Sequence, residues 1–298
     1  MRRIAGLLLL VSLVIAAACD RDGAAPTPTA PVTTPTTPAM TATPTATPTA
    51  TAEPAVCLRG EPFVANGAAR VGTSPPGDAH ELEGFRWERH EGCERLVIDF
   101  VAEDGRAANS AGRVEAEVLR DLGVVRVQLR DVEWVDTNAT DAMFAGPLAT
   151  AAFAVFSPDG RWTYVDVHLG AEAEAHVIVL NGPARVVVDL RPGGGAVPDP
   201  APREARVVVL EPRPGDARYP LTVTGYARTF EANVVTRIEQ GGSEVLEDFT
   251  TATAWVDAWG HYSFTIEDGP TGNIELHVGE YSARDGAWEG VAVRLQMR

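Results

Sequence analysis

Apolar and polar residues alternate with a period of two along much of the chain, and this pattern constrains the fold more than any other feature. The alternation is clear over residues 125–130 and returns over 291–298. A period of two places successive side chains on opposite faces of a strand, so these segments are predicted to be half-buried β-strands. Turn residues at 157–160 and 241–242 lie between such segments, which favours antiparallel hairpins.

Helix is expected to be a minor component. Only residues 112–122 and 141–152 have helical character, and the first segment fits a strand over 114–119 equally well. Two other segments, 94–100 and 184–190, each have an arginine before an apolar run and an aspartate within it. We expect these two strands to lie in one sheet and their charged residues to form an exposed cross-strand ion pair.

Two segments of biased composition divide the chain. Residues 24–54 contain twelve threonines and eight prolines, so residues 20–56 are predicted to be a disordered, extended tether. Glycine and proline exclude regular structure over a second linker, 193–203. The chain of 298 residues is therefore predicted to contain two β domains, 57–192 and 204–298.

Residues 1–19 are typical of an export signal peptide. Arg2 and Arg3 precede an apolar run over 4–18, and Cys19 follows three alanines. The run is short for a membrane span, which favours a cleaved signal. Cysteine after small residues resembles the bacterial lipobox, which implies that lipidated Cys19 becomes the N-terminus and anchors the protein to the membrane outside the cytoplasm. Ordinary secretion and a retained anchor are the alternatives.

The two remaining cysteines, Cys57 and Cys93, are an even pair at the start of the folded region. A disulfide between them is the simplest interpretation for an exported chain. It would close a loop of about 37 residues and contribute about 3–4 kcal/mol by restricting the unfolded chain. The alternative is a nucleophilic or metal-bound thiol at Cys93 near His90, but one histidine and one cysteine are an incomplete ligand set.

The net charge excludes one class of partner. The chain has 25 basic residues, all of them arginine, against 41 acidic residues, and its formal net charge is −16. A nucleic-acid interface needs an excess of basic side chains, so nucleic acid is not expected as a partner. Adsorption to anionic lipid by charge alone is disfavoured for the same reason.

The familiar signatures of catalytic and cofactor sites are missing from the sequence. It contains no Gly-x-Ser-x-Gly, His-Glu-x-x-His, phosphate-loop or Cys-x-x-Cys motif, and its six histidines are scattered. Carboxylate pairs such as Glu115 with Glu117 and Glu172 with Glu174 have the approximate spacing of the two catalytic carboxylates of a glycosidase. Because 41 acidic residues produce such pairs by chance, we predict no catalytic residue, no cofactor and no metal.

The most suggestive binding motif is formed by Trp255, Asp257 and Trp259. In a strand these three residues would share one face, and flat rings beside a carboxylate suit stacking on sugar rings. Packing of the rings in the core is the favoured interpretation, because a β-sandwich usually buries a tryptophan or two. Glycan contact by the three residues is the alternative hypothesis.

Two families resemble parts of the chain. The segments GFRWERHEGCERLVIDF at 84–100 and PARVVVDL at 183–190 resemble the AMIN-like domain of bacterial envelope lipoproteins. That resemblance implies a β domain with a role at the peptidoglycan or envelope. The segments PLTVTGYARTFEANV at 220–234, YSF at 262–264 and EYSARDG at 280–286 resemble the immunoglobulin-like domain of bacterial spore germination proteins, which implies a small non-catalytic β-sandwich.

Together these features predict an exported, lipid-anchored, mainly β protein of the bacterial cell envelope. An AMIN-like domain and an immunoglobulin-like sandwich would follow the signal peptide and tether, and would bind peptidoglycan or another envelope protein without catalysis. A cryptic hydrolase of envelope polysaccharide is one alternative. A ligand-capturing lipoprotein is the other, although such receptors usually have larger α/β lobes.

Overall fold

The computed structural model describes residues 62–71 and 76–298. Nearly all regular structure in these residues is β-strand, which confirms the prediction of a mainly β chain. The helices among them are two short 3-10 turns, η1 (Arg120–Leu122) and η2 (Phe230–Ala232). None of the helices in the described ranges is long and apolar enough to cross a membrane.

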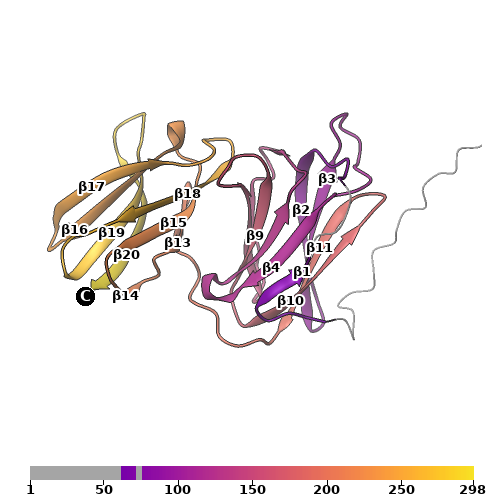
Figure 1. Ribbon diagram of the computed structural model, residues 1–298, viewed down its shortest axis with the longest axis horizontal. Coiled ribbons are helices and arrows are strands. Elements are labelled where there is room, and N and C mark those ends of the chain that lie inside the picture. The colour runs from indigo at the N-terminus through magenta and orange to yellow at the C-terminus, as the bar shows by residue number, and fades with distance from the viewer. Residues whose placement is uncertain (1–61, 72–75) are drawn as a thin grey trace, which may run out of the picture. The chain divides into compact units, whose positions relative to one another are not determined.

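The first half of the described chain is a sandwich of two sheets (Figure 1). One sheet has the order β10–β11–β3–β2–β6, with β2 (Glu81–His90), β3 (Cys93–Val101), β6 (Trp134–Val135), β10 (Ala173–Leu180) and β11 (Arg185–Pro192). The facing strands are β1 (Gly67–Arg70), β4 (Val114–Leu119), β5 (Val124–Leu129), β7 (Asp141–Met143), β8 (Ala149–Phe156) and β9 (Thr163–Leu169). Aliphatic side chains from both sheets fill the core between them.

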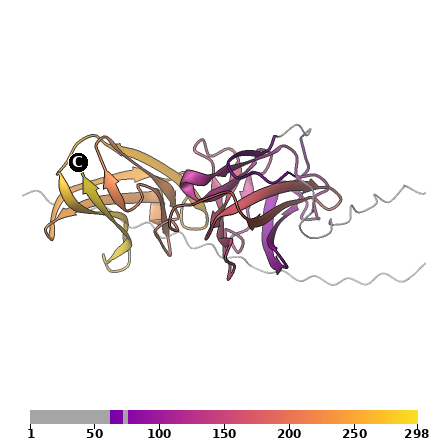
Figure 2. The same cartoon turned by 90° about the horizontal axis from the view of Figure 1, so that it is seen from below.

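The second half is also a sandwich of two sheets, seen from a second direction in Figure 2. One sheet has the order β14–β20–β19–β16–β17, with β14 (Gly215–Ala217), β16 (Asn233–Gln240), β17 (Ser243–Thr251), β19 (Gly272–Tyr281) and β20 (Trp288–Met297). The facing strands are β12 (Arg203–Glu204), β13 (Val207–Glu211), β15 (Leu221–Ala227) and β18 (Trp259–Ile266). A separate apolar core lies between these two sheets.

One sheet continues from the first sandwich into the second. Strands β8 and β18 pair in parallel, with Trp259 opposite Val155, so ten strands form a single hydrogen-bonded sheet. A third cluster of buried side chains covers this junction, and its large aromatic members include Phe153, Tyr164, Tyr226 and Trp259. The sandwiches are therefore joined by packing and backbone pairing as well as by the segment 193–203.

The two segments with helical character in the sequence do not form α-helices. Residues 114–119 form β4, which is the alternative that the sequence allowed. Residues 141–152 contain β7, then Gly146 and Pro147, then the start of β8. Proline cannot continue a helix, and the small side chains of β8 are buried at the centre of the sheet, so burial decides the structure here.

The repeated arginine and aspartate pattern lies on neighbouring strands, as predicted, but its ion pair is buried. Antiparallel pairing of β3 with β11 places Arg95 opposite Asp189. Arg95 Nε donates to Asp189 Oδ1 at 2.6 Å and Nη2 donates to Oδ2 at 2.7 Å. The two side chains are 4% and 0% exposed, so the expectation of an exposed pair is wrong. It fails because β3 has neighbours on both sides and is buried along most of its length.

Candidate binding face of the C-terminal sheet

The structure separates the three residues of the predicted glycan motif. Trp259 begins β18 and is buried, and its indole Nε1 donates to Asp141 Oδ1 at 3.0 Å while its ring meets Phe153 edge to face. Trp255 and Asp257 precede the strand in a turn, and the Trp255 ring is 55% exposed. The strand face that the three residues would share does not form. The interpretation that the tryptophans pack in the core is therefore correct for Trp259, whereas Trp255 is exposed.

The cysteine predictions fall mostly outside the described residues. Cys19, Cys57, the signal peptide and the tether all lie there, so lipidation and the disulfide stay predictions. Cys93 begins β3 and is buried. Among the carboxylates considered for hydrolysis, two have arginine partners: Glu115 lies 3.3 Å from Arg130, and Glu174 lies 2.7 Å from Arg191.

A buried polar network lies where the two sandwiches meet. Asp166 accepts two hydrogen bonds from Arg126 at 2.7 Å each and one from the Tyr226 hydroxyl at 3.1 Å. The Tyr226 oxygen lies 2.6 Å from His168 Nε2, and because the hydroxyl hydrogen goes to Asp166, this nitrogen is the donor. Burial lowers the pKa of His168 to about 4 and raises the pKa of Tyr226. The network thus links β9 to β15 and is enclosed by protein.

Aromatic and charged side chains gather on the exposed face of the sheet β14–β20–β19–β16–β17. The guanidinium carbon of Arg237 lies 4.0 Å from the ring centroid of Trp288 and 5.8 Å from that of Tyr281. Tyr281 and Trp288 are opposite each other in the β19–β20 register, and their rings meet edge to face at 5.3 Å. The Tyr281 hydroxyl donates to Glu247 at 2.7 Å, and this hydrogen bond raises the pKa of Tyr281. We call these four residues and Phe249, which lies two residues after Glu247 on the same face of β17, the outer cluster.

Two glycines allow β19, β20 and the Trp288 ring to pack closely. Gly279 and Gly290 are opposite each other in β19 and β20. A Cβ on Gly290 would lie 2.9 Å from Cζ2 of Trp288, and a Cβ on Gly279 would lie 2.2 Å from the Glu289 carbonyl oxygen. Such approaches are too short for any side chain, so glycine at both positions permits the close packing of these strands.

Strand β17 forms an edge of this sheet beside the outer cluster. It pairs with β16, and no second neighbour pairs with it among the residues that the structure describes. Val245 is 50% exposed and Phe249 is 70% exposed on this strand. Its other exposed residues include Glu244, Glu247 and Asp248. An exposed edge offers unpaired N–H and C=O groups to a further strand, so β17 is a natural place for another chain to pair.

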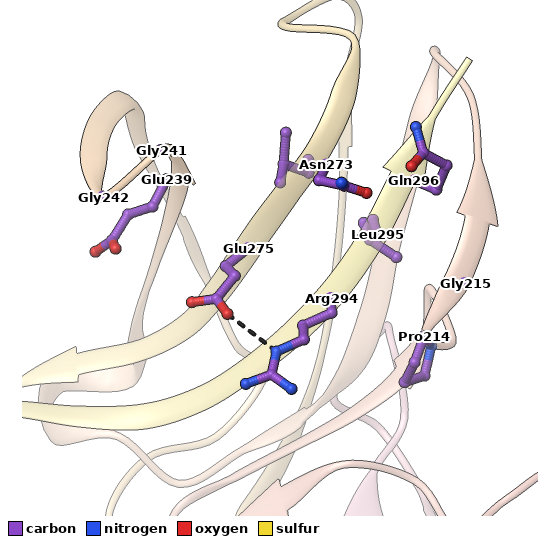
Figure 3. Close-up of a pocket in the computed structure, with 11 residues that line it drawn as sticks. Pro214, Gly215, Glu239, Gly241, Gly242, Asn273, Glu275, Arg294, Leu295 and Gln296 are labelled. Atoms are coloured by element: carbon purple, nitrogen blue, oxygen red, sulfur yellow. Dashed lines mark hydrogen bonds and ion pairs between the residues drawn. The ribbon is translucent and has the colours of Figure 1, made fainter.

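An open groove of about 760 Å³ crosses the same sheet near the hairpin between β16 and β17 (Figure 3). Its polar side chains come from β16, β19 and β20 and are Glu239, Asn273, Glu275, Arg294 and Gln296. Arg294 Nε donates to Glu275 Oε1 at 3.0 Å, which is the contact marked in Figure 3. Charged and amide side chains therefore form part of the lining, together with apolar residues such as Ile274 and Leu295.

Residues 206–287 match the family model of the immunoglobulin-like domain of bacterial spore germination. This match confirms the resemblance that the sequence showed over 220–234, 262–264 and 280–286. The immunoglobulin-like domain includes β13 to β19, and Trp288 of the outer cluster lies just past the matched residues. No curated protein matches the chain.

Sequence reasoning missed the outer cluster, although one signal for it was present. The residues are spread over four strands of the immunoglobulin-like domain, and only the strand register brings them together. The turn at Asp285 and Gly286 was recognisable, and a hairpin around that turn would place Tyr281 near Trp288. The position of Arg237 on the next strand depends on long-range pairing that no local pattern specifies.

Proposed function

We propose that this protein is a non-catalytic binding protein of the bacterial cell envelope. In this proposal Cys19 is lipidated, the first sandwich is an AMIN-like domain, and the immunoglobulin-like domain docks another envelope protein through the outer cluster and the edge of β17. The observation that carries the proposal is the contact among Arg237, Tyr281 and Trp288 on an exposed sheet face, beside the 70% exposed ring of Phe249.

The chemistry of the outer cluster favours a protein partner over a glycan. Arginine, tyrosine and tryptophan are enriched at the energetic centres of protein interfaces. Sugar stacking needs an open ring face, but Arg237 lies over Trp288, and the Tyr281 and Trp288 rings meet edge to face. Trp255 offers a single exposed ring in a turn, which is weaker support for binding of peptidoglycan.

The edge strand supports the same conclusion and indicates the character of the partner. Addition of a strand to an exposed sheet edge is a common mode of peptide recognition. Glu244, Glu247 and Asp248 give β17 a negative charge, so we expect the partner segment to carry basic residues. The apolar contribution would come from Val245 and Phe249.

The alternative functions have less support. Glu115 and Glu174 are already paired with arginines, which argues against their use as a hydrolytic acid and base. A ligand-capturing protein usually encloses its ligand in a largely apolar pocket. The groove of the immunoglobulin-like domain is instead open, with Glu239, Glu275 and Arg294 among its lining residues.

Site-specific photocrosslinking in cells of the source bacterium tests the proposal. A photoreactive phenylalanine analogue at Phe249 is expected to give one discrete protein adduct, which mass spectrometry then identifies. The same analogue at Trp134, which is 57% exposed in the first sandwich, is the matched control and should give no such adduct. Purified partner should then bind the Arg237→Ala variant at least tenfold more weakly than the wild type.

Sedimentation with purified peptidoglycan separates the glycan alternative from protein docking. We expect the Arg237→Ala variant to sediment as the wild type does, because the outer cluster is assigned to a protein. Retention on peptidoglycan that is lost in this variant, together with no adduct at Phe249, would contradict the proposal. Loss of retention in Trp255→Ala instead would move glycan recognition to the turn before β18.

A further inference from the structure

Three potential metal ligands converge on the exposed face of the immunoglobulin-like domain. Glu275 and His277 are two residues apart in β19 and share one face, and Glu239 of β16 lies directly opposite Glu275. One ligating atom of each residue lies within 4.8 Å of the other two. The strand register therefore fixes the spacing of all three groups on rigid backbone.

Two arginines orient the carboxylates toward the imidazole. Arg294 donates to Oε1 of Glu275, and the other oxygen, Oε2, lies 3.8 Å from His277 Nε2. Arg237 Nη2 lies 3.8 Å from Oε1 of Glu239. The other carboxylate oxygen of Glu239, Oε2, lies 3.6 Å from His277 Nε2. Each carboxylate thus has one oxygen near an arginine and presents the second oxygen to His277.

The His277 nitrogen has the environment of a ligand atom rather than that of a simple ion-pair donor. Nε2 is buried and makes no hydrogen bond to any residue in the described ranges. A charged hydrogen bond to a carboxylate would bring the atoms to about 2.7–2.9 Å. Tetrahedral ligands at about 2.1 Å from a zinc ion are about 3.4 Å apart, which is close to the observed 3.6 and 3.8 Å.

We propose that Glu239, Glu275 and His277 bind a divalent first-row transition metal ion such as Zn²⁺. Zinc commonly takes imidazole nitrogen and carboxylate oxygen ligands, and three protein ligands leave a fourth position for water. The adjoining groove is lined by Glu239 and Glu275, so solvent reaches the carboxylate side of the site. Ca²⁺ and Mg²⁺ prefer all-oxygen sites and bind here more weakly. The site borders the outer cluster, because Arg237 lies near Glu239 as well as over Trp288, but binding of Zn²⁺ does not require a docked protein.

Titration calorimetry of the full chain with Zn²⁺ alone, after removal of metal by a chelator, tests the site. The wild type should bind one equivalent, and Glu275→Gln and His277→Ala should each weaken binding at least tenfold. His90→Ala is the matched control, because His90 lies 3.5 Å from the single carboxylate of Glu88. This variant should bind Zn²⁺ as the wild type does.

Two further measurements keep the test decisive. X-ray absorption of the zinc-loaded chain should show one nitrogen and two or three oxygen ligands, and circular dichroism should show that Glu239→Gln and Glu275→Gln retain the fold. If Glu275→Gln or His277→Ala bound Zn²⁺ as tightly as the wild type does, the proposal would be overturned. It would also be overturned if the wild type bound no Zn²⁺ at a metal concentration of about 1 mM. Ca²⁺ binding as strong as Zn²⁺ binding would also contradict it.

Discussion

At the scale of single residues, the first sandwich contains an ion pair that is buried. Arg95 and Asp189 form two short hydrogen bonds and are almost completely enclosed. Neutralising one partner of a buried pair is far more costly than neutralising one partner of an exposed pair, because the remaining buried charge loses the attraction that offset its desolvation. This pair was visible in the sequence as a repeated pattern, but its burial was not, because burial depends on the strands on either side.

The Asp189→Asn variant tests the importance of this pair. We expect the free energy of unfolding to fall by about 3 kcal/mol, because the Arg95 charge loses its carboxylate partner in the buried sheet. Urea denaturation followed by circular dichroism measures the loss. Glu174→Gln is the control, because it breaks the ion pair of Glu174 with Arg191, in which Arg191 is 44% exposed. This variant should change the free energy of unfolding by less than about 1 kcal/mol. Equal effects of the two variants would refute the difference assigned to burial.

His168 makes stability depend on pH in a defined range. Its pKa of about 4 in the folded chain lies below the ordinary 6.5, so the unfolded chain binds this proton first as pH falls. The stability that neutral His168 contributes to the folded chain is complete above pH 6.5. It is lost as pH falls from about 6.5 to about 4, and the free energy of unfolding decreases by up to about 3 kcal/mol. His168→Gln can retain the hydrogen bond to Tyr226 and should flatten the dependence of unfolding free energy on pH in this range. An unchanged slope in the variant would contradict the assignment.

At the scale of elements, strand pairing explains both the success and the failure of sequence reasoning. The alternation at 125–130 and the turn at 157–160 identified β5 and the β8–β9 hairpin, because both signals are local. The segment 141–152 was misjudged because its small residues suit a helix until burial in the sheet is considered. The outer cluster depends on pairing across β16, β19 and β20, which local patterns do not specify.

The glycine pair in β19 and β20 provides a test at this scale. We expect Gly279→Ala to destabilise the immunoglobulin-like domain by about 1–3 kcal/mol, because the new Cβ would lie 2.2 Å from the Glu289 carbonyl oxygen. Thermal unfolding measures the loss, and the environment of Trp288 should change in its fluorescence. Gly286→Ala in the nearby turn is a control for space, since a Cβ added there would meet no atom within 4 Å, although its positive φ adds some strain. A stable Gly279→Ala variant with unchanged fluorescence would contradict this packing.

At the scale of the whole molecule, we expect the packed junction to make the two sandwiches interdependent in unfolding. The ten-stranded sheet passes through β8 and β18, and Phe153, Tyr226 and Trp259 pack across the junction. The glycine- and proline-rich composition of 193–203 was visible in the sequence, but the packed junction was not, since its residues come from distant parts of the chain. A docked partner would therefore bind a molecule whose sandwiches are held together by a buried core.

Calorimetric unfolding tests this interdependence. The wild type should unfold in one cooperative transition, because the junction couples the two cores. Trp259→Ala removes the largest ring of the junction and its hydrogen bond to Asp141, and we expect a loss of about 3–5 kcal/mol with a broadened or divided transition. Two well-separated transitions in the wild type would show that the sandwiches unfold independently.

Hydrogen–deuterium exchange of the full chain, with and without the partner identified by crosslinking, tests the central claim most directly. The account predicts that the partner slows exchange over β17, Ser243–Thr251, and over the β19–β20 hairpin around Tyr281 and Trp288. Protection confined to the turn at Trp255, or to the first sandwich, would contradict the assignment of the binding face.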